Sequence, residues 1–169
     1  MKSTIEMTDL GLLYYYLELQ IKQTEDRIVV SQQNYAKDLV RRFNMQGCNE
    51  ALTAINTNEL QASDGIGSAD IERYRSMVGG LIYLTHTRPD ILFVVGVVLK
   101  FMNNPTKHHL GTARRILRHV ARNTSFAIWY TYLYDFKLCG FINRNPARSL
   151  DDRRSTSSCV FILRTGVVT

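Results

Sequence analysis

The sequence has few of the features that mark disulfide-rich, zinc-binding or membrane-spanning proteins. Its three cysteines, Cys48, Cys139 and Cys159, are odd in number and widely separated, without a C-x-x-C pair. This pattern is typical of reduced intracellular cysteines, not of a disulfide framework or a zinc site. The longest apolar run, residues 91–99, ends at Lys100 and is far shorter than the roughly 20 residues that span a bilayer. It is therefore predicted to be a buried helix.

A signal peptide is not expected either, because Glu6 and Asp9 interrupt the hydrophobic stretch that would have to follow Lys2. No low-complexity tract or repeat is found in the 169 residues, of which 45% are hydrophobic and 21% charged. This is the composition of a globular protein. The length fits one domain, or a small domain with a piece of another. We expect an intracellular protein, cytoplasmic or nuclear.

Acidic residues are missing from one long stretch in the second half of the chain. Residues 91–134 contain no Asp or Glu but carry six Lys and Arg. The chain has 21 Lys and Arg against 15 Asp and Glu, so removing these six leaves 15 against 15. The whole net charge of +6 can therefore be assigned to this stretch. A sequence pI near 9.4 favours acidic partners, nucleic acid or a membrane surface.

The charges of this stretch gather on one side of a predicted helix, which we call the basic face. It consists of Lys107, Arg114, Arg115, Arg118 and Arg122. At about 100° per residue, the four arginines fan over an arc of roughly 100°. The apolar side holds Leu110, Ala113, Leu117, Val120 and Ala121, with Ile116 at its margin. Guanidiniums without a carboxylate three or four residues away repel one another, so an anionic partner is expected, and phosphate oxygens suit arginine. The alternatives are a solvated face or pairing with acids elsewhere in the fold.

The remaining pattern predicts helices followed by strands. Aromatic and β-branched residues over 11–21 and 27–31 predict a β-hairpin, and a helix is predicted over 32–45. Further helices are predicted from Asp70 and over 90–103, and strands over 126–134, 136–142 and 159–163. Gly79 and Gly80, inside the second helix, indicate close packing against another element. The predicted class is therefore α+β.

Two shorter patterns have competing interpretations. His108, His109 and His119 lie in the basic stretch, but the first two point to different helix faces and no carboxylate or thiolate is near, so no metal site is expected. Residues 115–118 spell R-I-L-R, which is the R-x-L-R string of oomycete secreted effectors. Those proteins carry it soon after a signal peptide, whereas here it lies mid-chain in an amphipathic helix. An effector identity remains an alternative.

Several stretches follow the motifs of one family in order and spacing. They are MTDLGLLYYYL at 7–17, IVVSQQNYAKDLVRRFNM at 28–45, YRSMVGGLIYLTHTRPDI at 74–91, FMNNP with ARRILRHV at 101–120, and LDDRRSTSSCVF at 150–161. Together they resemble the Pol polyproteins of Ty1/copia-type retrotransposons over nearly the whole chain. The resemblance implies a segment that follows the polymerase palm and runs into ribonuclease H. It also implies a template–primer duplex along this part of the protein.

The resemblance also implies a division of the chain. Residues 1–48 correspond to a hairpin and helix of the reverse transcriptase thumb-like region, and residues 49–69 to a linker without a core of its own. Residues 70–125 correspond to a helical connection region that includes the basic helix. Residues 126–169 correspond to a truncated, antiparallel ribonuclease H-like β-meander.

The catalytic motifs of the family are where this chain departs from it. The polymerase Y-x-D-D motif is absent, and the adjacent Asp151 and Asp152 match a ribonuclease H turn instead. Where the family has G-Y-S-D-A-D-W-A-G, this chain has GFINRNPAR, with Asn143 at the position of the first catalytic aspartate. The intact family uses Mg²⁺ ions, for which a neutral amide is a poor ligand. Neither activity, and no cofactor, is expected from this polypeptide.

The sequence thus predicts an inactive polyprotein fragment that binds an RNA·DNA or DNA duplex without sequence preference. No membrane contact and no small-molecule substrate are expected. The alternatives are an R-x-L-R-like effector or protein-interaction module whose arginines meet an acidic protein, and an expressed fossil without function. Glu18 stands where the family usually has Gly, so the first hairpin is expected to be distorted if φ is positive there.

Overall fold

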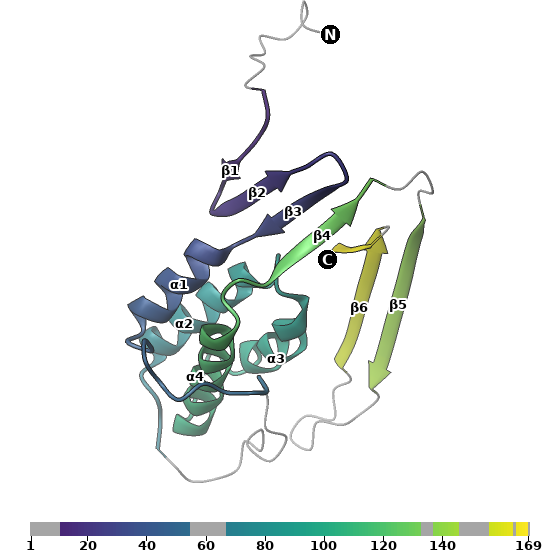
Figure 1. Ribbon diagram of the computed structural model, residues 1–169. Coiled ribbons are helices and arrows are strands. Elements are labelled where there is room, and N and C mark those ends of the chain that lie inside the picture. The colour runs from purple at the N-terminus through teal and green to yellow at the C-terminus, as the bar shows by residue number, and fades with distance from the viewer. Residues whose placement is uncertain (1–10, 55–66, 133–136, 146–155, 164, 169) are drawn as a thin grey trace, which may run out of the picture.

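The computed structural model describes residues 11–54, 67–132, 137–145, 156–163 and 165–168 (Figure 1). Within these residues, four helices and two antiparallel sheets confirm the α+β class. The strands are β1 (Tyr15–Tyr16), β2 (Leu19–Gln23), β3 (Arg27–Ser31), β4 (Ala127–Thr131), β5 (Leu138–Asn145), β6 (Thr156–Leu163) and β7 (Gly166–Val168). The helices are α1 (Gln33–Arg42), α2 (Ile71–Leu84), α3 (Pro89–Leu99) and α4 (Lys107–Arg122). The helices gather on one side of the first sheet, and the second sheet lies beside them (Figure 1).

The first sheet has the order β1-β2-β3-β4 and joins distant parts of the chain. β4 pairs antiparallel with β3, with Val29 opposite Trp129. β4 therefore does not belong to the meander that the sequence predicts over residues 126–169. Only β5, β6 and β7 form that antiparallel meander, and its likeness to ribonuclease H stays a prediction. The boundary at residues 125 and 126 also stays a prediction, although the first sheet crosses it.

The strand predicted over residues 11–21 is divided by a tight turn. Leu17 and Glu18 have φ angles of 45° and 60° and form the two-residue connection between β1 and β2. Two positive φ angles are typical of a type I′ turn, for which Asn-Gly is the preferred sequence. Side chains hold this turn in place: Tyr15 Oη donates to the Glu18 carboxylate, and Tyr83 Oη donates to the Leu17 carbonyl. The φ angle at Glu18 is therefore positive, which is the condition under which the sequence predicts a distorted hairpin.

The helices pack around one apolar core. Its largest fully buried apolar side chains come from all four helices, with Leu39 on α1, Tyr74, Met77, Leu81 and Leu84 on α2, Ile91 on α3, and Ile116 and Leu117 on α4. A Cβ atom on Gly80 would lie 2.4 Å from Leu39 Cδ1, so the predicted close packing is confirmed at Gly80. Gly79 has open space around it instead. Among the described residues, no helix combines the length and apolarity of a membrane span, and α3, very apolar, has only 11 residues.

Arg88 joins the start of α3 to the end of α4 and to β4. Its side chain is only 2% exposed, and Nε and Nη2 donate to Asp90 at 2.8 and 2.7 Å. Nη1 donates to the Asn123 carbonyl at 2.8 Å, and the guanidinium lies 4.9 Å from the centre of the Phe126 ring. His119 Nε2 lies 3.3 Å from the Asp90 carboxylate. Arg88 and Asp90 are neighbours in sequence, but their contacts with His119, Asn123 and Phe126 are long-range, so local patterns do not predict this group.

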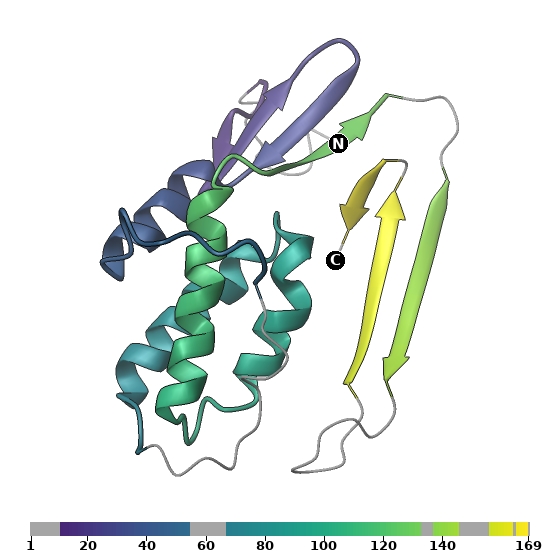
Figure 2. The same ribbon diagram turned by 60° about the horizontal axis from the view of Figure 1, so that its bottom comes forward.

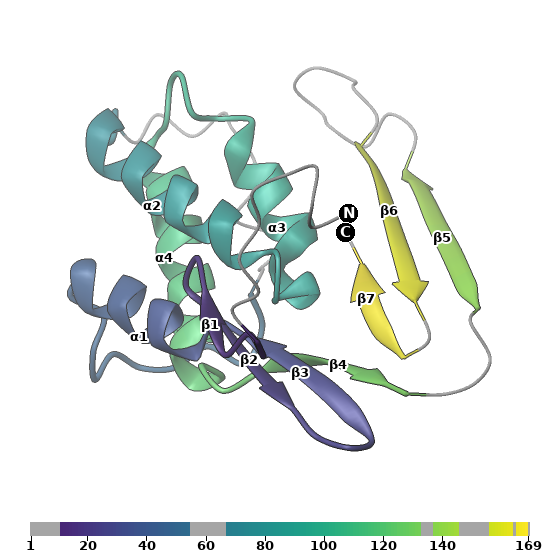
Figure 3. The same cartoon turned by 90° about the horizontal axis from the view of Figure 1, so that it is seen from above.

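The two sheets meet where β7 contacts β4 (Figure 3). Tyr130 Oη donates to the Val167 carbonyl at 2.7 Å, and the Thr131 amide donates to Thr165 Oγ1 at 3.2 Å. A Cβ atom on Gly166 would lie 2.3 Å from the Tyr130 ring. A glycine is therefore required for this close approach of β7 to Tyr130.

We predict that Glu18→Gly stabilises the protein by about 0.5–1 kcal/mol, because glycine adopts a positive φ without the strain that a side chain adds. This gain is expected to exceed both the loss of the exposed hydrogen bond from Tyr15 and the cost in unfolded-state entropy. Chemical denaturation monitored by circular dichroism measures the change. The control is Glu25→Gly in the β2–β3 turn, where φ is not positive and the same replacement should destabilise. Equal destabilisation by both replacements would contradict the account of the turn.

We predict that Asp90→Asn lowers the free energy of unfolding by about 2–3 kcal/mol, since it leaves the buried Arg88 without a charged partner. This is below the value for a fully buried pair, because the Asp90 side chain is 34% exposed. The same replacement at Asp38, whose pair with Arg41 is exposed, should cost less than about 1 kcal/mol.

This contribution of Asp90 should also depend on pH. Burial raises the pKa of the Asp90 carboxyl, but hydrogen bonds and charge from Arg88 and His119 outweigh burial and hold the pKa below its usual value of 3.8. The stabilisation is therefore complete above pH 3.8 and is lost as the pH falls through the lower, folded-state pKa. Chemical denaturation of the original chain and of Asp90→Asn at a series of acidic pH values measures their free energies of unfolding. The difference between the two should shrink as the pH falls. A difference that stays constant would contradict this role.

Candidate nucleic-acid interface

α4 presents opposite sides to the core and to the surface. Its core side includes Ile116, which is fully buried and not marginal as the sequence suggested. The helix begins with a capping box: the Thr106 side chain accepts from the His109 amide, and His109 Nδ1 accepts from the Thr106 amide at 3.0 Å. The buried His109 ring also stacks on Phe101, with ring centres 3.8 Å apart. His109 therefore caps the start of α4 and also packs against the core.

The basic face is partly covered by residues 49–53, which we call the strap. This segment leads away from the end of α1 and crosses α4 (Figure 2). The Ala51 amide donates to the Arg118 carbonyl at 3.4 Å, and Ala51 is buried. Ala54, just beyond the strap, also belongs to the core. The described part of the predicted linker thus packs against the helices, and residues 55–66 lie outside the described residues.

Two arginines of the basic face hold the strap. Arg115 donates from Nε to the Thr53 carbonyl at 3.3 Å and from Nη2 to Thr53 Oγ1 at 3.2 Å. Arg118 donates from Nε to the Asn49 carbonyl. Both arginines are half-buried as a result. These contacts span more than 60 residues of sequence, so no local pattern could have predicted them.

His119 links the strap to the buried Arg88 group. Its Nδ1 lies 3.2 Å from the Ala51 carbonyl, and its Nε2 lies 3.3 Å from Asp90. A neutral imidazole can donate to one of these acceptors, and only a protonated ring can donate to both. His119 therefore contributes to holding the strap against α4.

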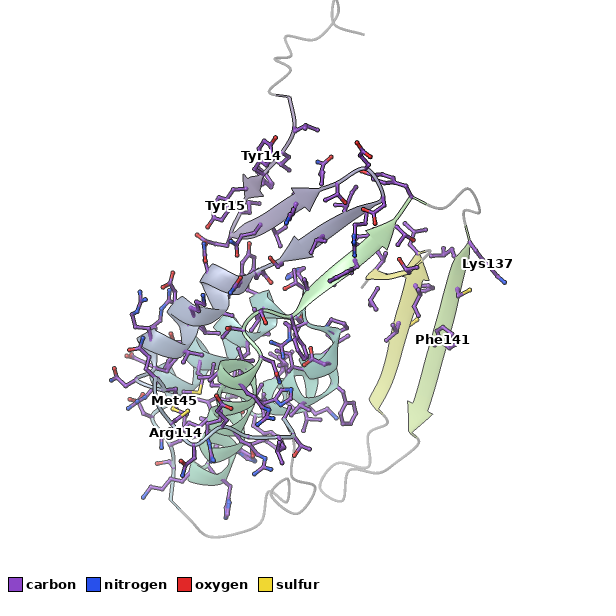
Figure 4. All side chains as sticks on the ribbon, in the orientation of Figure 1. Tyr14, Tyr15, Met45, Arg114, Lys137 and Phe141 are labelled. Atoms are coloured by element: carbon purple, nitrogen blue, oxygen red, sulfur yellow. The ribbon has the colours of Figure 1, made fainter. Side chains whose placement is uncertain are left out.

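The other three cations remain exposed and form what we call the outer stripe, Lys107, Arg114 and Arg122. Arg122 Nη1 lies 3.6 Å from the Glu50 carboxylate, with both side chains about half exposed. Arg114 has no hydrogen-bond or ion-pair partner among the described residues and projects from α4 (Figure 4). At about 1.5 Å per residue, the stripe extends over about 22 Å of the helix.

The geometry thus divides the five predicted residues into two groups. Arg115 and Arg118 already bind carbonyl oxygens. Arg122 pairs with an acidic residue from elsewhere in the fold, which is one of the alternatives that the sequence leaves open for the basic face. Exposed ion pairs contribute between about 0 and 1 kcal/mol, so the pair of Arg122 with Glu50 holds Arg122 only weakly. The outer stripe is therefore the part of α4 best placed to bind an external anion.

The residues at the expected catalytic positions do not form a described carboxylate site. Asn143 lies in β5, where its backbone pairs with that of Ser158. Asp151 and Asp152 lie outside the described residues. In the part of the chain that the structure covers, no three His, Cys, Asp or Glu side chains come close enough to hold a metal ion.

Comparison with known proteins links the chain to mobile elements and, more narrowly, to an effector. No family model and no solved structure matches. Over 96 residues the chain is 34% identical to a secreted RxLR effector protein of Plasmopara viticola, a match that covers 56% of this chain and 68% of that protein. Over 166 residues it is 31% identical to an uncharacterized mitochondrial protein of Arabidopsis thaliana, covering 96% of this chain and 68% of that protein.

A third match is to a named transposon polyprotein. The chain is 32% identical over 152 residues to the retrovirus-related Pol polyprotein from transposon RE1 of Arabidopsis thaliana. The match covers 89% of this chain but 10% of the polyprotein, so the chain spans about a tenth of that relative's length. The motif order noted in the sequence and these matches agree. The chain belongs to the family of copia-type, retrovirus-related Pol polyproteins.

Proposed function

We propose that the chain binds a nucleic-acid duplex, either an RNA·DNA hybrid or DNA, through the outer stripe of α4. The observation that carries this proposal is the exposed Arg114, which has no partner among the described residues and lies between two other exposed cations on a helix without a single acidic residue. A row of cations on one rigid helix suits a row of phosphates, because each contact releases bound counterions. Phosphate contacts carry no base information, so binding is independent of sequence.

The strap shapes this interface. Arg115 and Arg118 keep their bonds to the Thr53 and Asn49 carbonyls and act as positioning residues. Glu50 yields its place beside Arg122 when a phosphate arrives, since the pair is exposed and 3.6 Å long. In this proposal three residues, Lys107, Arg114 and Arg122, contact the duplex directly.

We also propose the position of the chain within the family and its lack of catalysis. The motif order supports a segment that follows the polymerase palm, with the thumb and connection first and the start of ribonuclease H last. The absence of the Y-x-D-D motif supports an inactive segment, and so does Asn143 at the position of a catalytic aspartate. Incubation with primed template, nucleotides and Mg²⁺, and separately with a labelled RNA·DNA hybrid, should give neither extension nor cleavage. Either product from pure protein would refute this part.

An effector or protein-interaction role is the second candidate, favoured by the match to the RxLR effector. In this fold the R-I-L-R string is part of α4: Ile116 and Leu117 are fully buried. Both of its arginines contact the strap. Recognition of this string as a short linear motif would require α4 to unfold, so we favour the duplex. Stronger binding to an acidic peptide than to a duplex would reverse this preference.

We predict that Arg114→Glu weakens duplex binding roughly ten-fold or more while leaving the fold intact, because it replaces one phosphate contact with a repulsion. Fluorescence anisotropy with a labelled RNA·DNA hybrid at fixed salt measures the affinity.

The matched control for this prediction is Lys137→Glu, which changes the net charge equally at a position far from Arg114 (Figure 4). If the loss reflects contact through the outer stripe, the control should retain most of the affinity. Equal losses in the two variants would show that only the overall charge matters and would contradict the proposed interface.

A further inference from the structure

Among the described residues, the second sheet leaves its long edge strand unpaired on one side. In the order β5-β6-β7, β5 has eight residues and pairs with β6. No other strand among the described residues pairs with its outer side. The backbone N–H and C=O groups of such an edge form a template for another strand.

The side chains of this edge are apolar on both faces of the sheet. Leu138 is 60% exposed, Phe141 60% and Ile142 70%. Because neighbouring residues of a strand point to opposite faces, Leu138 and Ile142 share one face and Phe141 lies on the other. Natural sheets protect exposed edges with charged residues, prolines or bulges, but residues 138–142, LCGFI, contain no charge and no proline.

We propose that two copies of the chain associate through β5 and form one continuous antiparallel sheet, with three strands from each copy. The two-fold axis passes through the sheet at Gly140. This register places Leu138 opposite the partner's Ile142, and Cys139 opposite the partner's Phe141. The surface is then self-complementary, as a two-fold symmetric interface must be. The apolar side chains on both faces then contact partner side chains across the new strand pair.

The sequence around Gly140 favours this register over its neighbours. Antiparallel pairing of a strand with itself keeps every residue on its own face, so only registers that centre on a residue are possible. A centre at Phe141 would place Leu138 opposite Arg144, and a centre at Cys139 would place Lys137 opposite Phe141. The centre at Gly140 alone pairs residues 138–142 entirely with apolar or small residues.

The position of β5 makes this association compatible with the rest of the molecule. β5 lies at the outer margin, on the side of the second sheet away from the helices (Figures 1 and 3). Phe141 and Lys137 on this side are far from Arg114 on α4 (Figure 4). The proposed dimer therefore leaves both outer stripes open, and it does not depend on the proposed duplex binding.

The first test is the molar mass in solution, measured by light scattering on a gel-filtration column over a dilution series. The original chain should approach twice its mass of 19.4 kDa at the higher concentrations. Ile142→Lys should remain monomeric with an unchanged circular dichroism spectrum, and Leu138→Lys should do the same. The control Leu12→Lys, at a similarly exposed leucine in another part of the chain, should still dimerise. A chain that is monomeric throughout, or a dimer that survives Ile142→Lys, would overturn the proposal.

The second test reads the register through disulfide formation. In a background with Cys48→Ser, Cys139→Ala and Cys159→Ser, the variants Leu138→Cys and Ile142→Cys are made separately. Directly opposed strand residues have Cα atoms about 4.5–5.5 Å apart, within the range of a disulfide. Mild oxidation should therefore link the two variants when they are mixed and should link neither with itself. Equal cross-linking in the single-variant samples would refute the centre at Gly140.

Discussion

A buried guanidinium is the constraint on which the arrangement of the strap on α4 depends. Arg88 must keep its charge in a site that is almost closed to water, so Asp90 is held beside it with two hydrogen bonds. Asp90 in turn lies against His119 on α4, and His119 lies against the Ala51 carbonyl of the strap. The same group fixes the end of α4 through Asn123 and contacts Phe126 just before β4. Core, strap and first sheet thus share one charged cluster.

The strap changes what the basic face can do. A row of five cations on a helix has a repulsive energy that some acceptor must offset. The chain provides part of the acceptors itself, since backbone carbonyls of the strap accept from Arg115 and Arg118. The outer stripe remains available to an external partner. It has three cations, whereas the basic face predicted from the sequence has five. A duplex is therefore proposed to bind along one line of α4.

Local patterns predicted the parts of this structure whose causes are local. The amphipathic period of α4, the hairpin of β2 and β3, and the close packing at Gly80 follow from neighbouring residues. The pairing of β4 with β3, the burial of Arg88 and the strap on α4 all join residues far apart in sequence. Single-sequence patterns contain no register between such segments, so they place β4 in the later meander instead of beside β3 and do not show that residues 49–53 pack on α4.

The division of the basic face is most directly tested by the salt dependence of binding to an RNA·DNA hybrid. Each phosphate contact adds about 0.9 to the slope of log affinity against log salt. Three contacts from the outer stripe predict a slope of about −3, whereas engagement of all five cations, with the strap displaced, would give about −4.5. A slope of about −3 would support the account. The steeper slope, or no binding at low salt by the folded chain, would contradict it.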